Sequence, residues 1–97
     1  MAHVKDPKDF QKQARLFKAL AHPTRLMIID SLLKGEKCVG DIQDLLKSSQ
    51  PNVSQHLSIL KTCGIVDFCQ QGNVRCYHLK NPERIQVILE SLPCNAG

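Results

Sequence analysis

The fold is decided by residues 39–60, whose sequence is VGDIQDLLKSSQPNVSQHLSIL. This stretch predicts two short helices joined by a polar turn at residues 47–50. In the second helix, Val53, Leu57 and Leu60 recur at helical spacing, and the positions between them carry mostly small hydrogen-bonding residues. A bracing helix followed by a helix that enters the major groove is the layout of a helix-turn-helix. We therefore predict a DNA-reading helix-turn-helix at about residues 39–63.

The segments on either side complete a winged helix. Asp6-Pro7 and His22-Pro23 each predict a helix start, giving helices at about residues 6–21 and 23–34. After the reading helix the period changes, and strands are expected at 65–69 and 74–79 around a hairpin signal at 71–73. A last helix follows from Asn81 to Pro93. The expected fold is mainly α with one β-hairpin: four helices, two strands and a helix in a single domain over residues 1–97, with the wing at about 65–80.

Composition narrows the classes of function. The 97-residue chain has a net charge of +4 and a predicted pI of about 8.9, which suits a polyanionic partner. It contains no apolar run long enough to cross a membrane and no signal-peptide core, so we expect a cytoplasmic protein without a membrane partner. Glycine-rich phosphate loops and the GxSxG and HExxH motifs are absent from the sequence. The chain is therefore predicted not to be an enzyme and to need no obligatory cofactor.

The outward face of the reading helix and the tip of the hairpin are the candidate DNA surface. Short polar side chains suit base edges, and lysine or arginine suits phosphate. The alternative is an ordinary solvated surface, but residues 48–64 contain no acidic side chain, and this favours DNA. His56 either touches DNA or packs against a neighbouring helix. The candidates are Ser49, Gln50, Asn52, Ser54, Gln55, His56, Ser58 and Lys61 on the helix, and Gln71, Asn73 and Arg75 on the wing.

The first and last helices lie outside the helix-turn-helix core, and both are more apolar than a solvated helix needs. We expect them to pair with their copies in a homodimer, which would read two half-sites of double-stranded DNA. The alternative is that they pack only on their own core.

Three segments carry a resemblance to a known family. Residues 16–26 (LFKALAHPTRL), 35–42 (GEKCVGDI) and 50–60 (QPNVSQHLSIL), with the hairpin that holds Tyr77, resemble the ArsR/SmtB family of metal-responsive repressors. The resemblance covers nearly the whole chain. It implies a homodimer that binds operator DNA when free of effector and is released when a metal or metalloid binds.

The familiar effector sites of that family are incomplete in this sequence. Arsenic and cadmium sensors carry Cys-Val-Cys where this chain has Cys38-Val39-Gly40. Zinc sensors carry Asp and His on the last helix, and residues 82–92 contain neither. Cys63 matches one position of a cadmium and lead sensor type, but Ile59 stands where its second cysteine would be.

The five cysteines remain the candidate effector ligands: Cys38, Cys63, Cys69, Cys76 and Cys94. None is paired as CxxC, which excludes a zinc ribbon, and thiolates select soft ions such as As(III) or a soft divalent metal. Each cysteine has the alternative of being an ordinary packed or incidental residue. In a reducing compartment all five should be free thiols, and their odd number argues against a disulfide framework.

Cys69 and Cys76 form the most suggestive pair. They lie directly opposite if Gly72-Asn73 is the turn, and diagonally if Gln71-Gly72 is, so either register places them on one face of the hairpin.

The sequence thus predicts a repressor released from operator DNA by arsenite or a soft metal ion. Two alternatives stay open. One is a thiol or persulfide redox sensor of the same fold, in which Cys94 resembles one of the two sensing cysteines, although residues 24–34 lack the other. The second is a winged helix that serves only as a protein-interaction module.

Overall fold

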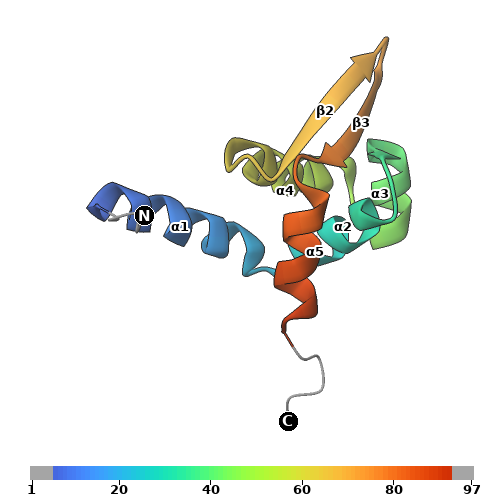
Figure 1. Ribbon diagram of the computed structural model, residues 1–97. Coiled ribbons are helices and arrows are strands. Elements are labelled where there is room, and N and C mark those ends of the chain that lie inside the picture. Colours follow the sequence, from blue (N-terminus) through green and yellow to red (C-terminus); the bar gives the residue numbers. More distant parts are fainter. Residues whose placement is uncertain (1–5, 93–97) are drawn as a thin grey trace.

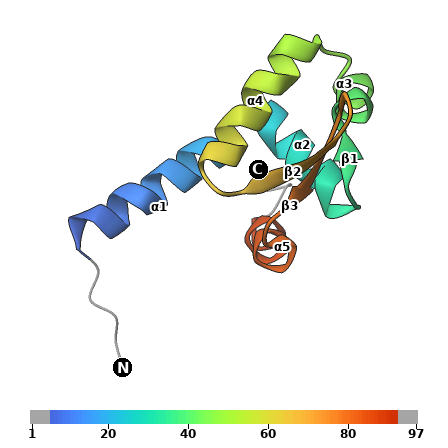
Figure 2. The ribbon, with the colours of Figure 1, turned by 90° about the horizontal axis from the view of Figure 1, so that it is seen from above.

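The computed structural model describes residues 6–92, which form five helices and three strands. Figure 1 shows them in the order α1 (Pro7–Leu20), α2 (Pro23–Leu33), β1 (Lys37–Cys38), α3 (Val39–Leu46), α4 (Gln50–Thr62), β2 (Val66–Gln71), β3 (Val74–Leu79) and α5 (Pro82–Glu90). The β2–β3 hairpin extends away from the helices, and α1 projects from the body on another side (Figures 1 and 2). This is the winged helix-turn-helix that the sequence predicts.

The hydrophobic core holds the reading helix in place. Val53, Leu57 and Leu60 of α4 have no exposed surface, as their helical spacing predicts. They belong to one cluster with side chains from the other elements: Ala19, Ile28, Ile29, Leu32, Ile42, Ile65, Val66, Tyr77, Leu79 and Ile85. The outward face of α4 is therefore fixed by the burial of its inward face.

The helix ends follow local sequence signals. Asp6 caps α1 by accepting from the backbone N–H groups of Lys8 and Asp9, and the Asp9 carboxylate in turn accepts from the Asp6 backbone N–H. Ser49 caps α4, so Gln50 is the first residue of this helix and Pro51 the second. Gly64 ends α4 with a φ of 77°, a conformation that glycine adopts without steric cost.

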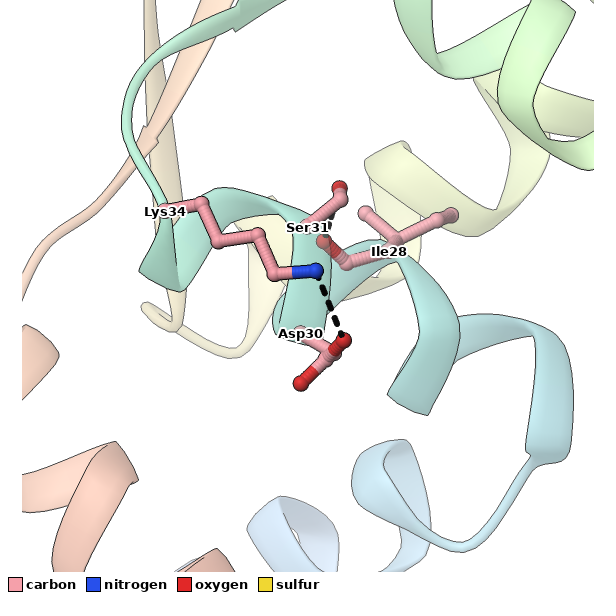
Figure 3. Close-up of polar contacts among 4 residues, drawn as sticks. All are labelled: Ile28, Asp30, Ser31 and Lys34. Atoms are coloured by element: carbon pink, nitrogen blue, oxygen red, sulfur yellow. Dashed lines mark hydrogen bonds and ion pairs between the residues drawn. The ribbon is translucent and has the colours of Figure 1, made fainter.

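Figure 3 shows two polar contacts of the second helix, one inside it and one with the residue that follows it. The Ser31 hydroxyl donates to the Ile28 carbonyl at 2.7 Å, so this buried polar group is satisfied. On the exposed side, Nζ of Lys34 lies 3.8 Å from a carboxylate oxygen of Asp30. Surface pairs of this kind contribute little, so burial of Ile28, Ile29 and Leu32 accounts for most of the stability of α2.

The sheet has one more strand than the sequence predicts. Its order is β1-β3-β2, all antiparallel, and β1 adds only the two pairs Lys37–Tyr77 and Cys38–Cys76. The sequence gives no signal for β1, because a strand of two residues is too short to show a periodicity. In the hairpin, the Gly72-Asn73 turn sets Cys69 directly opposite Cys76, which confirms one of the two registers considered.

One expectation about side chains is wrong. The cysteines are not all free thiols: a disulfide joins Cys38 to Cys76. These residues are 38 positions apart, and the pairing of β1 with β3 brings them together.

None of the helices in residues 6–92 combines the length and the apolar character that a membrane crossing requires.

Candidate nucleic-acid interface and cysteine row

The N-terminal end of α4 is built by hydrogen bonds among its own polar residues. The Ser49 hydroxyl accepts from the Asn52 backbone N–H at 3.3 Å, and the Asn52 side-chain amide donates to the Ser48 hydroxyl at 2.7 Å. Ser49 therefore acts as a cap as well as a DNA candidate. Gln50 and Asn52 are both exposed at the end of the helix, where backbone N–H groups favour an anion such as phosphate.

Along α4, the remaining candidates divide into outward and inward positions. Gln55, Ser58 and Lys61 are exposed, and Ser54 is half-buried. Lys61 also has partners in the wing, since its Nζ lies 3.9 Å from an Asp67 carboxylate oxygen and 5.4 Å from the centre of the Phe68 ring. The lysine charge is thus held at the junction of the reading helix and the wing.

Asp67 is the acidic residue at that junction. A hydrogen bond from the Phe68 backbone N–H, made at 2.8 Å, lowers the pKa of its carboxyl group, and the nearby charge of Lys61 lowers it further. Asp67 therefore stays ionised at neutral pH and offsets part of the positive charge of Lys61.

His56 is half-buried on the side of α4 that faces the start of α2. Its ring lies 4.6 Å from that of His22, and its Nδ1 is 3.3 Å from a guanidinium nitrogen of Arg25. Burial lowers the pKa of His56, as do the charges of His22 and Arg25. The geometry matches the packing alternative for this residue, with α2 as the neighbour.

Arg25 is a residue that the sequence analysis missed. Its Nε donates to the Ala19 carbonyl at 2.6 Å, and a second nitrogen donates to the Lys18 carbonyl at 3.4 Å. One guanidinium therefore joins the end of α1 to His56 of α4. In the sequence, Arg25 is only one residue of a segment that carries the family resemblance. Its contact with His56, 31 residues away, becomes visible only in the folded structure.

The wing presents Arg75 on an aromatic support. Its guanidinium carbon lies 4.4 Å from the centre of the Phe68 ring, and its Nε donates to Gln70 at 3.4 Å. Phe68 in turn packs 5.3 Å from the ring of the buried Tyr77. Gln70 and Phe68 were not among the predicted residues, although they orient one that was. Gln71 and Asn73 are exposed beside the turn, as expected for a wing tip.

Three cysteines form what we call the cysteine row: Cys38 of β1, Cys76 of β3 and Cys69 of β2. Each is the direct partner of the next across the antiparallel sheet, so the three side chains project from one face. Cys38 and Cys76 are half-buried and joined by the disulfide, while Cys69 is exposed and free. The row brings together three of the five predicted effector ligands.

The two other predicted cysteines are not part of the row. Cys63 is half-buried at the end of α4, where it packs against the core and its thiol donates to the Arg15 carbonyl at 3.9 Å. Cys94 lies outside the described residues. Within residues 6–92 no three His, Cys, Asp or Glu side chains are arranged to hold a metal ion, and two of the three sulfur atoms of the row are bound to each other.

Comparison with known proteins shows the family. A model of bacterial regulatory proteins of the arsR family matches residues 22–67. An uncharacterized HTH-type transcriptional regulator of Methanocaldococcus jannaschii is 42% identical over 84% of this chain and 91% of its own. The HTH-type transcriptional repressor SmtB of Mycobacterium tuberculosis is 36% identical over 79% of this chain and 57% of its own. A CadC-homologous cadmium resistance transcriptional regulatory protein of Staphylococcus aureus is 37% identical over 86% of this chain and 73% of its own.

A solved structure shows the same fold. The solution structure of a homodimeric winged helix-turn-helix DNA-binding domain from Mycobacterium bovis, a possible ArsR-family regulator, superposes with a TM-score of 0.74. It is 29% identical and covers 94% of this chain and 92% of its own.

Proposed function

The chain belongs to the ArsR family of bacterial regulatory proteins, and we propose that it is a homodimeric repressor released from operator DNA by a thiophilic ion. The comparisons support a DNA-binding transcriptional repressor of the ArsR/SmtB type, which is not an enzyme. The operator, the dimer and the effector are the parts that we propose.

The surface of α4 is the observation that carries the DNA proposal. Its inner face is fully buried, and its outer face offers amides and hydroxyls with no acidic group between residues 48 and 64. Asn and Gln can each bond adenine at two atoms, and Ser can bond a base or a phosphate. On the wing, Arg75 is held over Phe68, where its charge can reach a phosphate or the minor groove. Together these residues supply both base contacts and backbone contacts.

Exposed apolar side chains on the first and last helices support the dimer. Phe17 of α1 is 61% exposed, and Val87 of α5 is 67% exposed. Leu16 and Phe10 of α1 and Leu92, just beyond α5, are exposed as well. Apolar groups of this size gathered on two helices are typical of a protein interface. A dimer that reads two half-sites one turn of DNA apart needs its two copies of α4 about 34 Å apart.

The cysteine row supports a thiophilic effector. In its reduced form the row offers three thiol groups from adjacent strands, and thiolates bind soft ions such as As(III) or Cd(II). Cys38 caps α3, and Cys76 follows the DNA candidate Arg75. An ion bound here would act on the start of the helix-turn-helix and on the wing together. The name of the cadmium resistance relative agrees with an effector of this class.

The test is fluorescence anisotropy of the reduced full-length protein on the DNA upstream of its own gene, before and after arsenite is added. We expect tight binding that weakens with salt and is released by arsenite, with a coupling free energy of about 1–3 kcal/mol. Release by cadmium alone would keep the thiophilic effector and change the ion. Equal binding with and without every soft ion would overturn the effector. Absence of salt-dependent binding to any duplex would favour a protein-interaction module.

A further inference from the structure

The disulfide occupies a position that matters for the DNA surface. It joins Cys38, the residue before α3, to Cys76 in the middle of the wing strand β3. Apart from this bond, β1 and β3 are joined by only two residue pairs, whereas β2 and β3 share six. The disulfide is therefore a covalent link between the residue that precedes the helix-turn-helix and the wing.

The disulfide also changes what the cysteine row can bind. With Cys38 and Cys76 joined, Cys69 is the one free thiol of the row. A single exposed thiol is a poor site for an ion that needs two or three sulfur ligands. Reduction restores the other two donors. The same three residues thus exist in one form that suits a soft ion and one form that does not.

We infer that Cys38 and Cys76 are a reversible dithiol whose oxidation to the disulfide closes the cysteine row to its thiophilic effector. The inference rests on the proposed effector and adds a redox condition to it. The repressor would answer the ion only while the row is reduced. An oxidising environment would leave the disulfide form insensitive to the ion.

The oxidant is a low-molecular-weight disulfide, and the reaction is an exchange. The thiolate of one cysteine attacks a sulfur of the small disulfide, whose S–S bond breaks and releases one small thiolate. The second cysteine, as a thiolate, attacks the protein sulfur of this mixed disulfide and displaces the second small thiolate. The two protein thiols lose two electrons and two protons. The small disulfide takes up the electrons and leaves as two thiols.

The position of Cys69 makes it the matched control for this chemistry. It lies next to Cys76 in the row but is not part of the disulfide. Cys69→Ser should therefore leave the oxidation intact while it removes one ligand for the ion. Cys63, at the end of α4, is the control outside the row, and Cys63→Ser should leave both properties unchanged.

The first experiment maps the disulfide without DNA. The fully reduced full-length protein is treated with glutathione disulfide, and its free thiols are titrated after denaturation. We expect five free thiols before oxidation and three after it, with the missing pair located at Cys38 and Cys76 by peptide mapping. Cys38→Ser and Cys76→Ser should form no intrachain disulfide. A bond between any other pair, or five thiols after treatment, would overturn the inference.

The second experiment measures arsenite binding to the same samples by equilibrium dialysis. We expect binding to the reduced protein, a fall on oxidation to the level of the double variant Cys38→Ser/Cys76→Ser, which also keeps only Cys69 in the row, and full recovery after reduction. Equal binding by the reduced and oxidised forms would overturn the gating. A reduced protein that binds no arsenite or cadmium would overturn the proposed effector and the gating with it, while the thiol map would still decide whether the dithiol exists.

Discussion

The reading helix and the wing are held in place by different means. Three side chains of α4 have no exposed surface, so the helix cannot move without opening the core. The outer half of the hairpin, from Cys69 to Arg75, is exposed. The wing is held at its base, where Phe68 meets Tyr77 and Asp67 lies 3.9 Å from Lys61, and by the disulfide from Cys76 to Cys38. A change at this base can shift the wing while the reading helix stays rigid, which makes it a suitable place for control.

The largest expected effect is loss of the covalent link at the base of the wing. For a loop closed by residues 38 positions apart, the chain-entropy model gives a stabilisation of about 4 kcal/mol. Cys38→Ser should lower the free energy of unfolding of the oxidised protein by that order. Serine caps a helix well, so α3 itself should not suffer. Urea unfolding of the oxidised protein measures the effect.

Two comparisons test whether the disulfide is the cause. Oxidised Cys69→Ser should keep the wild-type stability, since its disulfide is intact. In the presence of a strong reductant, the difference between wild type and Cys38→Ser should vanish. A persistent difference under reductant would show that Cys38 stabilises the fold by packing instead.

A cavity under the reading helix should have the next largest effect. Leu57→Ala truncates a side chain with no exposed surface. Such changes lower the free energy of unfolding by about 2–5 kcal/mol, and we expect about 3 kcal/mol here. Operator binding should fall because part of the protein is unfolded. Ser58→Ala, on the exposed face one residue later, should alter the free energy of unfolding by less than about 0.5 kcal/mol. Comparable losses in both variants would contradict the idea that α4 is fixed by its inner face.

The charge on the wing should matter for DNA affinity and little for stability. Arg75→Ala should lower operator affinity by about tenfold and reduce the slope of log affinity against log salt by about one, as for the loss of one phosphate contact. Gln70→Ala removes the acceptor of the Arg75 hydrogen bond. It should cause a smaller loss of operator affinity and leave the salt slope unchanged. Anisotropy titrations at several salt concentrations distinguish the two. A salt slope that Arg75→Ala leaves unchanged would place the wing away from DNA.

Prediction from the sequence succeeded where the signal is local. The spacing of Val53, Leu57 and Leu60 is visible within eight residues, and so is the glycine turn of the hairpin. The failures concern contacts between distant residues. Cys38 and Cys76 meet only because β1 pairs with β3, and a strand of two residues gives no periodicity to detect. The link from Arg25 to His56 likewise depends on how α2 packs on α4.

The smallest expected effect concerns that link, on the inner flank of the reading helix. Because the pKa of His56 is lowered in the folded state, folding favours its neutral form. The contribution of His56 to stability is therefore complete above the unfolded pKa of about 6.5 and is lost as the pH falls through the folded value. Urea unfolding of wild type should show a small decline in the free energy of unfolding between about pH 7.5 and pH 5.5. His56→Gln should reduce this decline, because its amide oxygen still accepts from Arg25 but does not titrate. If the free energy of unfolding depends on pH in His56→Gln as it does in wild type, protonation of the His56 ring does not weaken its contact with Arg25. If operator affinity in wild type instead falls more steeply with decreasing pH than the free energy of unfolding does, Arg25 and His22 set the orientation of α4. The reading helix would then depend on its surroundings more than its buried face indicates.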